Sequence, residues 1–137
     1  MQDLTLDQRL PGAAWQAQQA LIRSGHCELL PAAQILPMTR IQIARDLAMA
    51  QALTQAAVAG KTVVLLAGSG HVNRELGVPL HLPAGWTSRA LRLRPRTPDD
   101  DLSPPADFDQ VWITRAVAPV DYCANFRANL DAKPSTP

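Results

Sequence analysis

The chain has 137 residues, which is enough for one domain with a core but not for two. Apolar residues make up 47% and charged residues 18%, as in a typical folded protein. A net charge of +1 excludes a strong field that would draw the chain to nucleic acid or to an anionic membrane. No apolar run approaches the length of a membrane span, and the opening MQDLTLDQRL has no targeting signal.

The first half of the sequence predicts two helices. Residues 14–25 carry an apolar stripe at helical spacing. The stretch that follows contains Pro31 and Pro37 and predicts a short turn of helix between loops. Residues 38–59 form the clearest helix, for which Thr39 is a suitable N-cap.

The second half of the sequence predicts strands, loops and a closing helix. Residues 61–67, KTVVLLA, predict a strand that is buried on both faces. Residues 90–96 and 108–114 predict two further strands, residues 121–130 a helix, and residues 132–137 a disordered tail. The expected fold class is therefore α/β, with helices that flank a small, mostly parallel sheet.

Two phosphate-binding motifs are present only in part. The GKT at 60–62 ends like a P-loop, but Gln55 stands where that motif needs a glycine, and the helix comes before the strand instead of after it. The GSG at 68–70 begins like a dinucleotide fingerprint, but Asn73 replaces its third glycine. We therefore reject both motifs.

The cysteines and histidines do not form a zinc motif. His26, Cys27, His71, His81 and Cys123 lack the close paired spacing of a structural zinc site. The residues leave two interpretations of the cysteines open: two buried free thiols, or one long-range disulfide, which requires an oxidising compartment.

A candidate site follows the predicted buried strand, in VLLAGSGHVNRELGVP at 64–79. Ligand sites gather beyond the carboxyl ends of parallel strands, so His71 is a candidate binding residue. A structural histidine with satisfied hydrogen bonds is the alternative. On the long helix, Gln42, Asp46 and Met49 fall on one line beside the apolar stripe. Asp46 can therefore point inward and accept hydrogen bonds, although a partly exposed ion pair is the commoner arrangement.

Three segments of the sequence carry a family resemblance: GHCELLP, PMTRIQIARDLAMAQAL and VVLLAGSGHVNRELGVPLHL. Together they resemble the C-terminal half of the ChaN-like haem-binding proteins, which belong with the Tiki and erythromycin-esterase-like superfamily. The similarity runs from residue 14 to 82 and resumes more weakly at FDQVWIT and DYCANF. It identifies residues 1–131 as the C-terminal portion of a single domain whose N-terminal strands are absent from this chain.

The resemblance implies a non-enzymatic haem-binding protein of bacterial iron acquisition. Such proteins are periplasmic or associated with the outer membrane, often as lipoproteins, and commonly form homodimers; the export signal and any anchor are absent from this chain. An exported location makes a Cys27–Cys123 disulfide as good an expectation as two free thiols.

The same resemblance implies a set of haem-binding residues. The family is thought to bind haem iron through a tyrosine, an oxygen ligand that suits ferric iron, and the chain has a single tyrosine, Tyr122. His71 is expected to hydrogen-bond a haem propionate, and Arg45 or Arg74 to pair with one. The remaining candidates are Gly68, Gly70, Asp46, Gln42, His26 and Met38.

The superfamily also implies an enzymatic alternative. Some of its members are hydrolases that use histidine and carboxylate residues, sometimes with a metal. In a metal-dependent hydrolase of this type, His71 would act as the acid or base and Asp46 would orient it.

Overall fold

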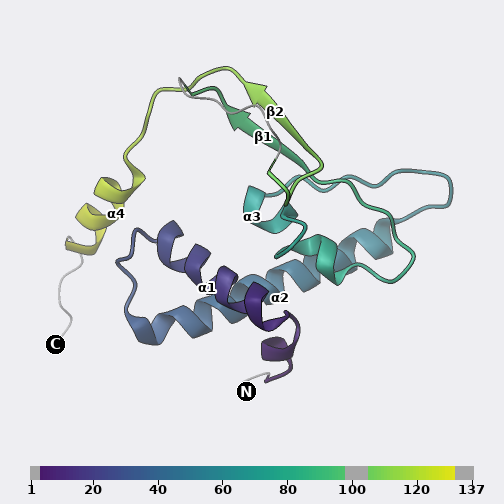
Figure 1. Cartoon of the computed structure of the whole chain (residues 1–137), viewed down its shortest axis with the longest axis horizontal. Coiled ribbons are helices and arrows are strands. Elements are labelled where there is room, and N and C mark those ends of the chain that lie inside the picture. Colours follow the sequence, from purple (N-terminus) through teal and green to yellow (C-terminus); the bar gives the residue numbers. More distant parts are fainter. Residues whose placement is uncertain (1–3, 98–104, 132–137) are drawn as a thin grey trace.

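The computed structural model describes residues 4–97 and 105–131 of the chain. Two helices cross at the base, a pair of strands lies above them, and a short helix sits between these two layers (Figure 1). The predicted α/β class is confirmed. The predicted tail at 132–137 lies outside the described residues. In chain order the elements are η1 (Leu4–Gln8), α1 (Gly12–Gly25), α2 (Ala32–Ala56), α3 (Ser69–Val72), η2 (Val78–His81), β1 (Leu91–Pro95), β2 (Gln110–Thr114) and α4 (Tyr122–Asp131).

The long helix α2 begins earlier than the sequence predicts. It runs without interruption through Pro37, so the predicted short turn of helix between loops is wrong. Pro37 stands near the N-terminal end of α2, where its missing N–H removes only one backbone hydrogen bond. Thr39 is not an N-cap but a buried residue inside the helix, and its hydroxyl donates to the carbonyl of Ile35 at 2.8 Å. Neither α2 nor any other described helix is long and apolar enough to cross a membrane.

The core lies along one face of α2. The fully buried side chains of Thr39, Ile43 and Asp46 come from this face. Ile22 of α1 and Val78 of η2 are also buried, and both of their elements pack against α2. Besides Thr39, whose hydroxyl is bonded to the helix backbone, the buried face of α2 holds one carboxylate at its centre, and a buried carboxylate requires a partner.

The segment η1 is attached to α2 by an ion pair. The guanidinium of Arg40 donates to both carboxylate oxygens of Asp7, at 2.7 and 2.5 Å. This hydrogen bond holds the pKa of Asp7 below its usual value. The pair fixes the N-terminal end of the described chain against the helical layer.

The described sheet has two parallel strands. Leu91 of β1 pairs with Gln110 of β2, and Pro95 pairs with Thr114 at the other end. Just before the strands, the backbone N–H of Asp109 donates to the carbonyl of Ala90 at 2.9 Å, and the N–H of Ala90 donates to a carboxylate oxygen of Asp109 at 2.7 Å. This double link sets the register in which β1 and β2 pair.

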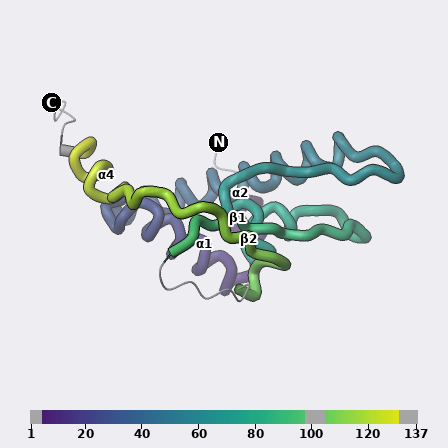
Figure 2. Tube along the Cα trace, turned by 90° about the horizontal axis from the view of Figure 1, so that it is seen from above, coloured from purple at the N-terminus to yellow at the C-terminus, as the bar shows by residue number. Residues whose placement is uncertain are grey.

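The buried strand predicted at 61–67 is not formed, so that prediction is wrong. Within the described chain, the segment pairs with neither β1 nor β2. The side chains of Val64 and Leu66 are 73% and 89% exposed. β-Branched and apolar residues favour a strand, but a strand also needs a neighbouring strand to pair with. Residues 57–68 instead project from the end of α2 as an extended excursion (Figures 1 and 2).

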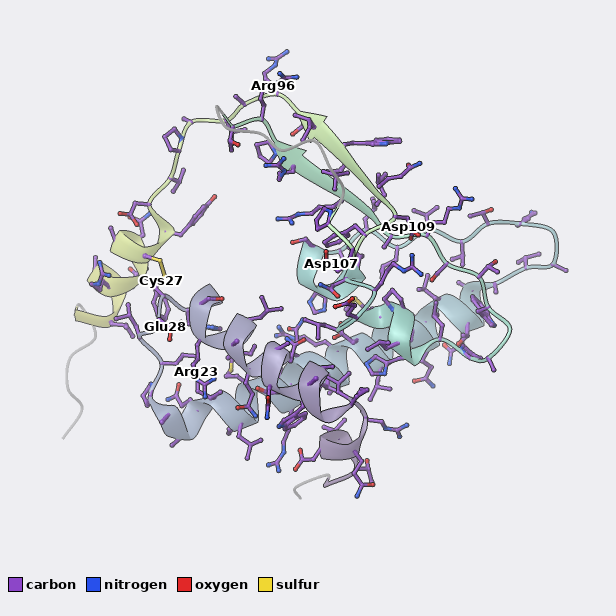
Figure 3. All side chains as sticks on the ribbon, in the orientation of Figure 1. Arg23, Cys27, Glu28, Arg96, Asp107 and Asp109 are labelled. Carbon is purple, nitrogen blue, oxygen red and sulfur yellow. A yellow bond between two sulfur atoms is a disulfide. The ribbon has the colours of Figure 1, made fainter. Side chains whose placement is uncertain are left out.

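The helix α4 is tied to the helical layer by a disulfide. Cys27 and Cys123 are bonded, and their Cα atoms lie 5.6 Å apart. Figure 3 shows Cys27 just beyond the end of α1, facing α4. Cys27 and Glu28 both have φ of 58°, in the left-handed region, so the chain turns sharply there. His26 and Phe126 add an edge-to-face ring contact at 6.0 Å.

Candidate functional site

The candidate site is a carboxylate–histidine pair at the contact between α2 and α3. Gln42 and Asp46 lie one turn apart on α2 and face the ring of His71 on α3. The ring Nδ1 lies 2.6 Å from Oδ1 of Asp46 and 2.9 Å from the side-chain nitrogen of Gln42. The Asp46 side chain is buried, whereas that of His71 is 21% exposed. The histidine therefore has one side fixed in the protein and another open to solvent.

The hydrogen on the ring can be assigned from these contacts. A short contact to a carboxylate requires that Nδ1 carry the hydrogen and donate it to Asp46. The same nitrogen cannot then accept from Gln42, but the side-chain nitrogen of Gln42 also lies 3.5 Å from Nε2 and can donate to it. In the neutral ring, the lone pair is then on Nε2, and a ligand would have to replace the long Gln42 contact to bind there.

Burial also changes the acidity of Asp46. Desolvation by burial raises its pKa to about 6, and the hydrogen bond from His71 opposes that rise. At neutral pH the group is mainly a carboxylate, which agrees with its role as the acceptor for Nδ1. Its second oxygen, Oδ2, is buried and has no hydrogen-bond partner among the described residues. The protonated form is therefore readily reached below neutrality.

The position of His71 depends on a close backbone contact with Gly77. A Cβ atom on Gly77 would lie 2.2 Å from the carbonyl oxygen of His71 and 2.9 Å from that of Gly70. Both are backbone atoms, so neither can move aside as a side chain would. The N–H of Gly77 also donates to the carbonyl of Asn73 at 2.9 Å. Gly77 is thus required to fold residues 71–77 into a tight loop that presents His71.

A second set of polar contacts attaches this loop to the sheet. The amide of Asn73 donates to the carboxylate of Asp107 at 2.6 Å, and its oxygen accepts the backbone N–H groups of Glu75 and Leu76. The guanidinium of Arg74 donates to Asp109 at 2.5 Å. Figure 3 shows Asp107 and Asp109 in the space between α3 and the strands, and both come just before β2 in the chain. The sequence did not reveal these links, because their partners lie 34 and 35 residues apart.

An apolar cavity lies next to the histidine. It has a volume of about 300 Å³ and is lined by Val72, Val78 and Pro79 together with residues 62–66 and 88–91. Leu53, Leu82 and Leu93 complete its apolar wall. His71 is not among its lining residues, although Val72 follows it directly in α3. The cavity therefore adjoins the carboxylate–histidine pair without containing it.

The other predicted haem-binding residues do not converge on His71. Tyr122 is 75% exposed at the start of α4, a helix that lies at one end of the molecule, well apart from the central α3 (Figure 1). Arg45 is exposed on α2 beside Asp46, and Arg74 is paired with Asp109.

The remaining candidate binding residues are His26, Met38, Gly68 and Gly70, and the structure gives the position of each. His26 Nδ1 lies 2.7 Å from the carbonyl oxygen of Ile22, at the end of α1. Met38 is half-buried within α2. Gly68 precedes α3, where a Cβ would lie 3.9 Å from the His71 ring, and Gly70 has open space around its Cα.

A small α/β fold that presents a carboxylate-held histidine beside an apolar cavity has the features of a ligand-binding module. Comparison with known families identifies the family to which this module belongs. Residues 2–82, more than half of the chain, match the family described as "Haem-binding uptake, Tiki superfamily, ChaN". The chain belongs to this family, and a haem-related role follows from it. No curated protein and no solved structure matches the chain.

Proposed function

We propose that the chain binds haem through the site at His71 and serves bacterial haem uptake or haem holding. The observation that carries the proposal is the Asp46–His71 pair, which binds Nδ1 of a ring whose side chain is 21% exposed and leaves Nε2 with only a 3.5 Å contact to Gln42. Imidazole nitrogen is a common axial ligand of haem iron, and a carboxylate on the other nitrogen fixes the ring and raises its basicity. In the imidazolium form of the ring, Nε2 carries a hydrogen and can instead donate it to a propionate.

The surroundings of His71 suit the rest of a haem molecule. The adjoining cavity has walls of valine, leucine and proline side chains, which match an apolar macrocycle. We further propose that Arg45, which is exposed one position from Asp46, pairs with a propionate. Bound haem would contribute a ferric iron, for which His71 would be the protein ligand. Tyr122 remains a second candidate for that ligand.

Titration with haemin, followed by the Soret band, tests the proposal. We expect a shifted and intensified band for the native chain and an affinity at least about tenfold lower for His71→Ala. His26→Gln is the matched control, because His26 is bound to a helix carbonyl away from the site. A ferric-tyrosinate spectrum that disappears in Tyr122→Phe would assign the iron to Tyr122. An affinity that His71→Ala leaves unchanged would contradict the proposed site.

The same geometry supports a second candidate function, that of a metal-dependent hydrolase. Asp46 holds Nδ1 of His71 at 2.6 Å, which is the arrangement of an acid–base histidine and its orienting carboxylate. Metal analysis of the purified chain separates the two functions. Stoichiometric divalent metal without haemin affinity would support the hydrolase, whereas haemin binding without metal would exclude it.

We also propose an exported location for the chain. The Cys27–Cys123 disulfide supports it, because disulfides persist in oxidising compartments such as the bacterial periplasm. Localising the natural gene product in its own cells by fractionation is the direct measurement. Recovery in the cytoplasmic fraction, with both cysteines reduced, would contradict an exported location.

A further inference from the structure

The side-chain amide of Gln42 contacts both nitrogens of the His71 ring. Its nitrogen lies 2.9 Å from Nδ1 and 3.5 Å from Nε2. Nδ1 donates its hydrogen to Asp46 at 2.6 Å, so Nε2 is the ring atom that can accept a hydrogen from Gln42. Because a separation of 3.5 Å is long for a hydrogen bond, a ligand of Nε2 can replace this contact at little cost.

The same amide has a second acceptor beside it on α2. Gln42 and Asp46 are one helical turn apart, a spacing at which side chains are neighbours and a glutamine can hydrogen-bond an aspartate. Oδ1 of Asp46 is bound to His71, whereas Oδ2 is buried and has no hydrogen-bond partner among the described residues. A buried carboxylate oxygen without a donor is costly in free energy. The Gln42 amide is a neighbouring donor that can remove this cost.

We propose that the Gln42 amide is a two-position switch at this site. In the first position, which the structure shows, the amide faces Nε2 of His71. In the second position, which it takes when Nε2 binds haem iron, the amide donates to Oδ2 of Asp46. A hydrogen bond to a carboxylate is about twice as strong as one between neutral groups, so the exchange favours the bound form. The switch rests on the proposed function, because it requires that His71 bind the iron.

The exchange requires only a rotation of the Gln42 side chain. This side chain is half-buried, and a rotamer change of a partly exposed residue is fast compared with ligand binding. The His71 ring keeps its place, because Nδ1 donates to Oδ1 of Asp46 in both positions. With Gln42 on Oδ2, the carboxylate has a donor on each oxygen and holds the ring more firmly while the ligand is bound. Gln42 is therefore a positioning residue that acts through Asp46 and His71.

Stopped-flow mixing with haemin, followed by the Soret band, tests the switch. In Gln42→Ala, Nε2 loses its competing donor and Oδ2 has no donor in the bound form. The association rate and the dissociation rate should therefore both rise, each by about 2- to 10-fold. Gln51→Ala is the matched control, because Gln51 is an exposed glutamine of the same helix, and it should keep both native rates.

The outcomes separate the switch from the proposed function. If His71→Ala weakens haemin binding but Gln42→Ala raises only one rate or neither, the switch alone is overturned. If His71→Ala leaves the haemin affinity unchanged, the proposed function is wrong and the switch falls with it.

Nitrogen-15 NMR of the chain without haemin tests the first position by itself. At alkaline pH the ring resonances of His71, assigned by their loss in His71→Ala, should show a hydrogen on Nδ1 and a lone pair on Nε2. Gln42→Ala should shift the Nε2 resonance, because water replaces the fixed amide as its donor, and should leave the resonances of His26 and His81 in place. An Nε2 resonance that is the same in Gln42→Ala and the native chain would overturn the switch.

Discussion

The Nδ1 atom of His71 lies 2.6 Å from Oδ1 of Asp46, although 25 residues separate the two in the chain. The contact joins the middle of α2 to the short helix α3. One partner is completely buried and the other is partly exposed. The buried carboxylate therefore positions the ring, and the partly exposed ring is the part of the pair that a ligand can contact.

Replacing Asp46 should weaken the site through His71. Asp46→Asn removes the charge that holds Nδ1, and loss of such a supporting carboxylate typically costs about 10- to 100-fold in affinity. We expect a loss of this size in haemin titrations. The double variant with His71→Ala should bind no more weakly than His71→Ala alone, because the two residues act as one unit. Glu75→Gln, which changes an exposed carboxylate nearby, is the control. Additive losses of affinity in the double variant would contradict the coupling of Asp46 and His71.

The stability of the chain should depend on pH through Asp46. Burial raises the folded pKa from 3.8 to about 6, so the folded state holds this proton more tightly than the unfolded state does. The resulting stabilisation is complete below about pH 4 and is lost as the pH rises through about 6. In thermal unfolding, the difference in midpoint temperature between the native chain and Asp46→Asn should change between about pH 4 and pH 6. It should level off at higher pH.

The other carboxyl groups are present in both the native chain and Asp46→Asn, so their contributions to the pH dependence cancel when the two are compared. Asp7, whose pKa is lowered by Arg40, has the opposite dependence and loses its contribution as the pH falls. If the difference in midpoint temperature between the native chain and Asp46→Asn stays constant between pH 4 and 7, then Asp46 does not titrate in the folded state with a raised pKa.

Much of the helical layer could be predicted from local pattern. The stripe on α2 and the strands β1 and β2 depend on spacing within a few residues, which the sequence displays directly. The placement of Gln42 and Asp46 on one line of α2 also follows from helical periodicity. The inward position of Asp46 could be anticipated for the same reason.

The remaining features depend on partners that sequence spacing does not reveal. Residues 61–67 have the composition of a strand but no strand beside them among the described residues. Asn73 and Asp107 are 34 residues apart, and no local pattern connects them. Pro37 suggested a break, yet α2 continues because tertiary packing outweighs the loss of one hydrogen bond near its start.

Gly77→Ala should disrupt the loop that presents His71. The added Cβ would lie 2.2 Å from a backbone oxygen, so the backbone must shift, and overpacking of this kind costs about 1–3 kcal/mol or more. We expect a lower midpoint in urea unfolding together with weaker haemin binding. Gly12→Ala is the matched control, because Gly12 lies in the first turn of α1 with open space around it, and alanine there should be neutral or slightly stabilising. Equal midpoints for Gly77→Ala and the native chain would contradict the close contact.

The disulfide should stabilise the chain and hold α4 in place. Cys27 and Cys123 are 96 residues apart, and loss of a disulfide that closes so long a loop costs about 2–5 kcal/mol. Reduction should lower the free energy of unfolding by this amount and raise hydrogen exchange in α4 more than in α2, whose core contacts do not involve the disulfide. The double variant Cys27→Ser, Cys123→Ser should match the reduced chain and show no further response to a reductant. If α4 stays equally protected after reduction, then noncovalent contacts such as that of His26 with Phe126, rather than the disulfide, hold it.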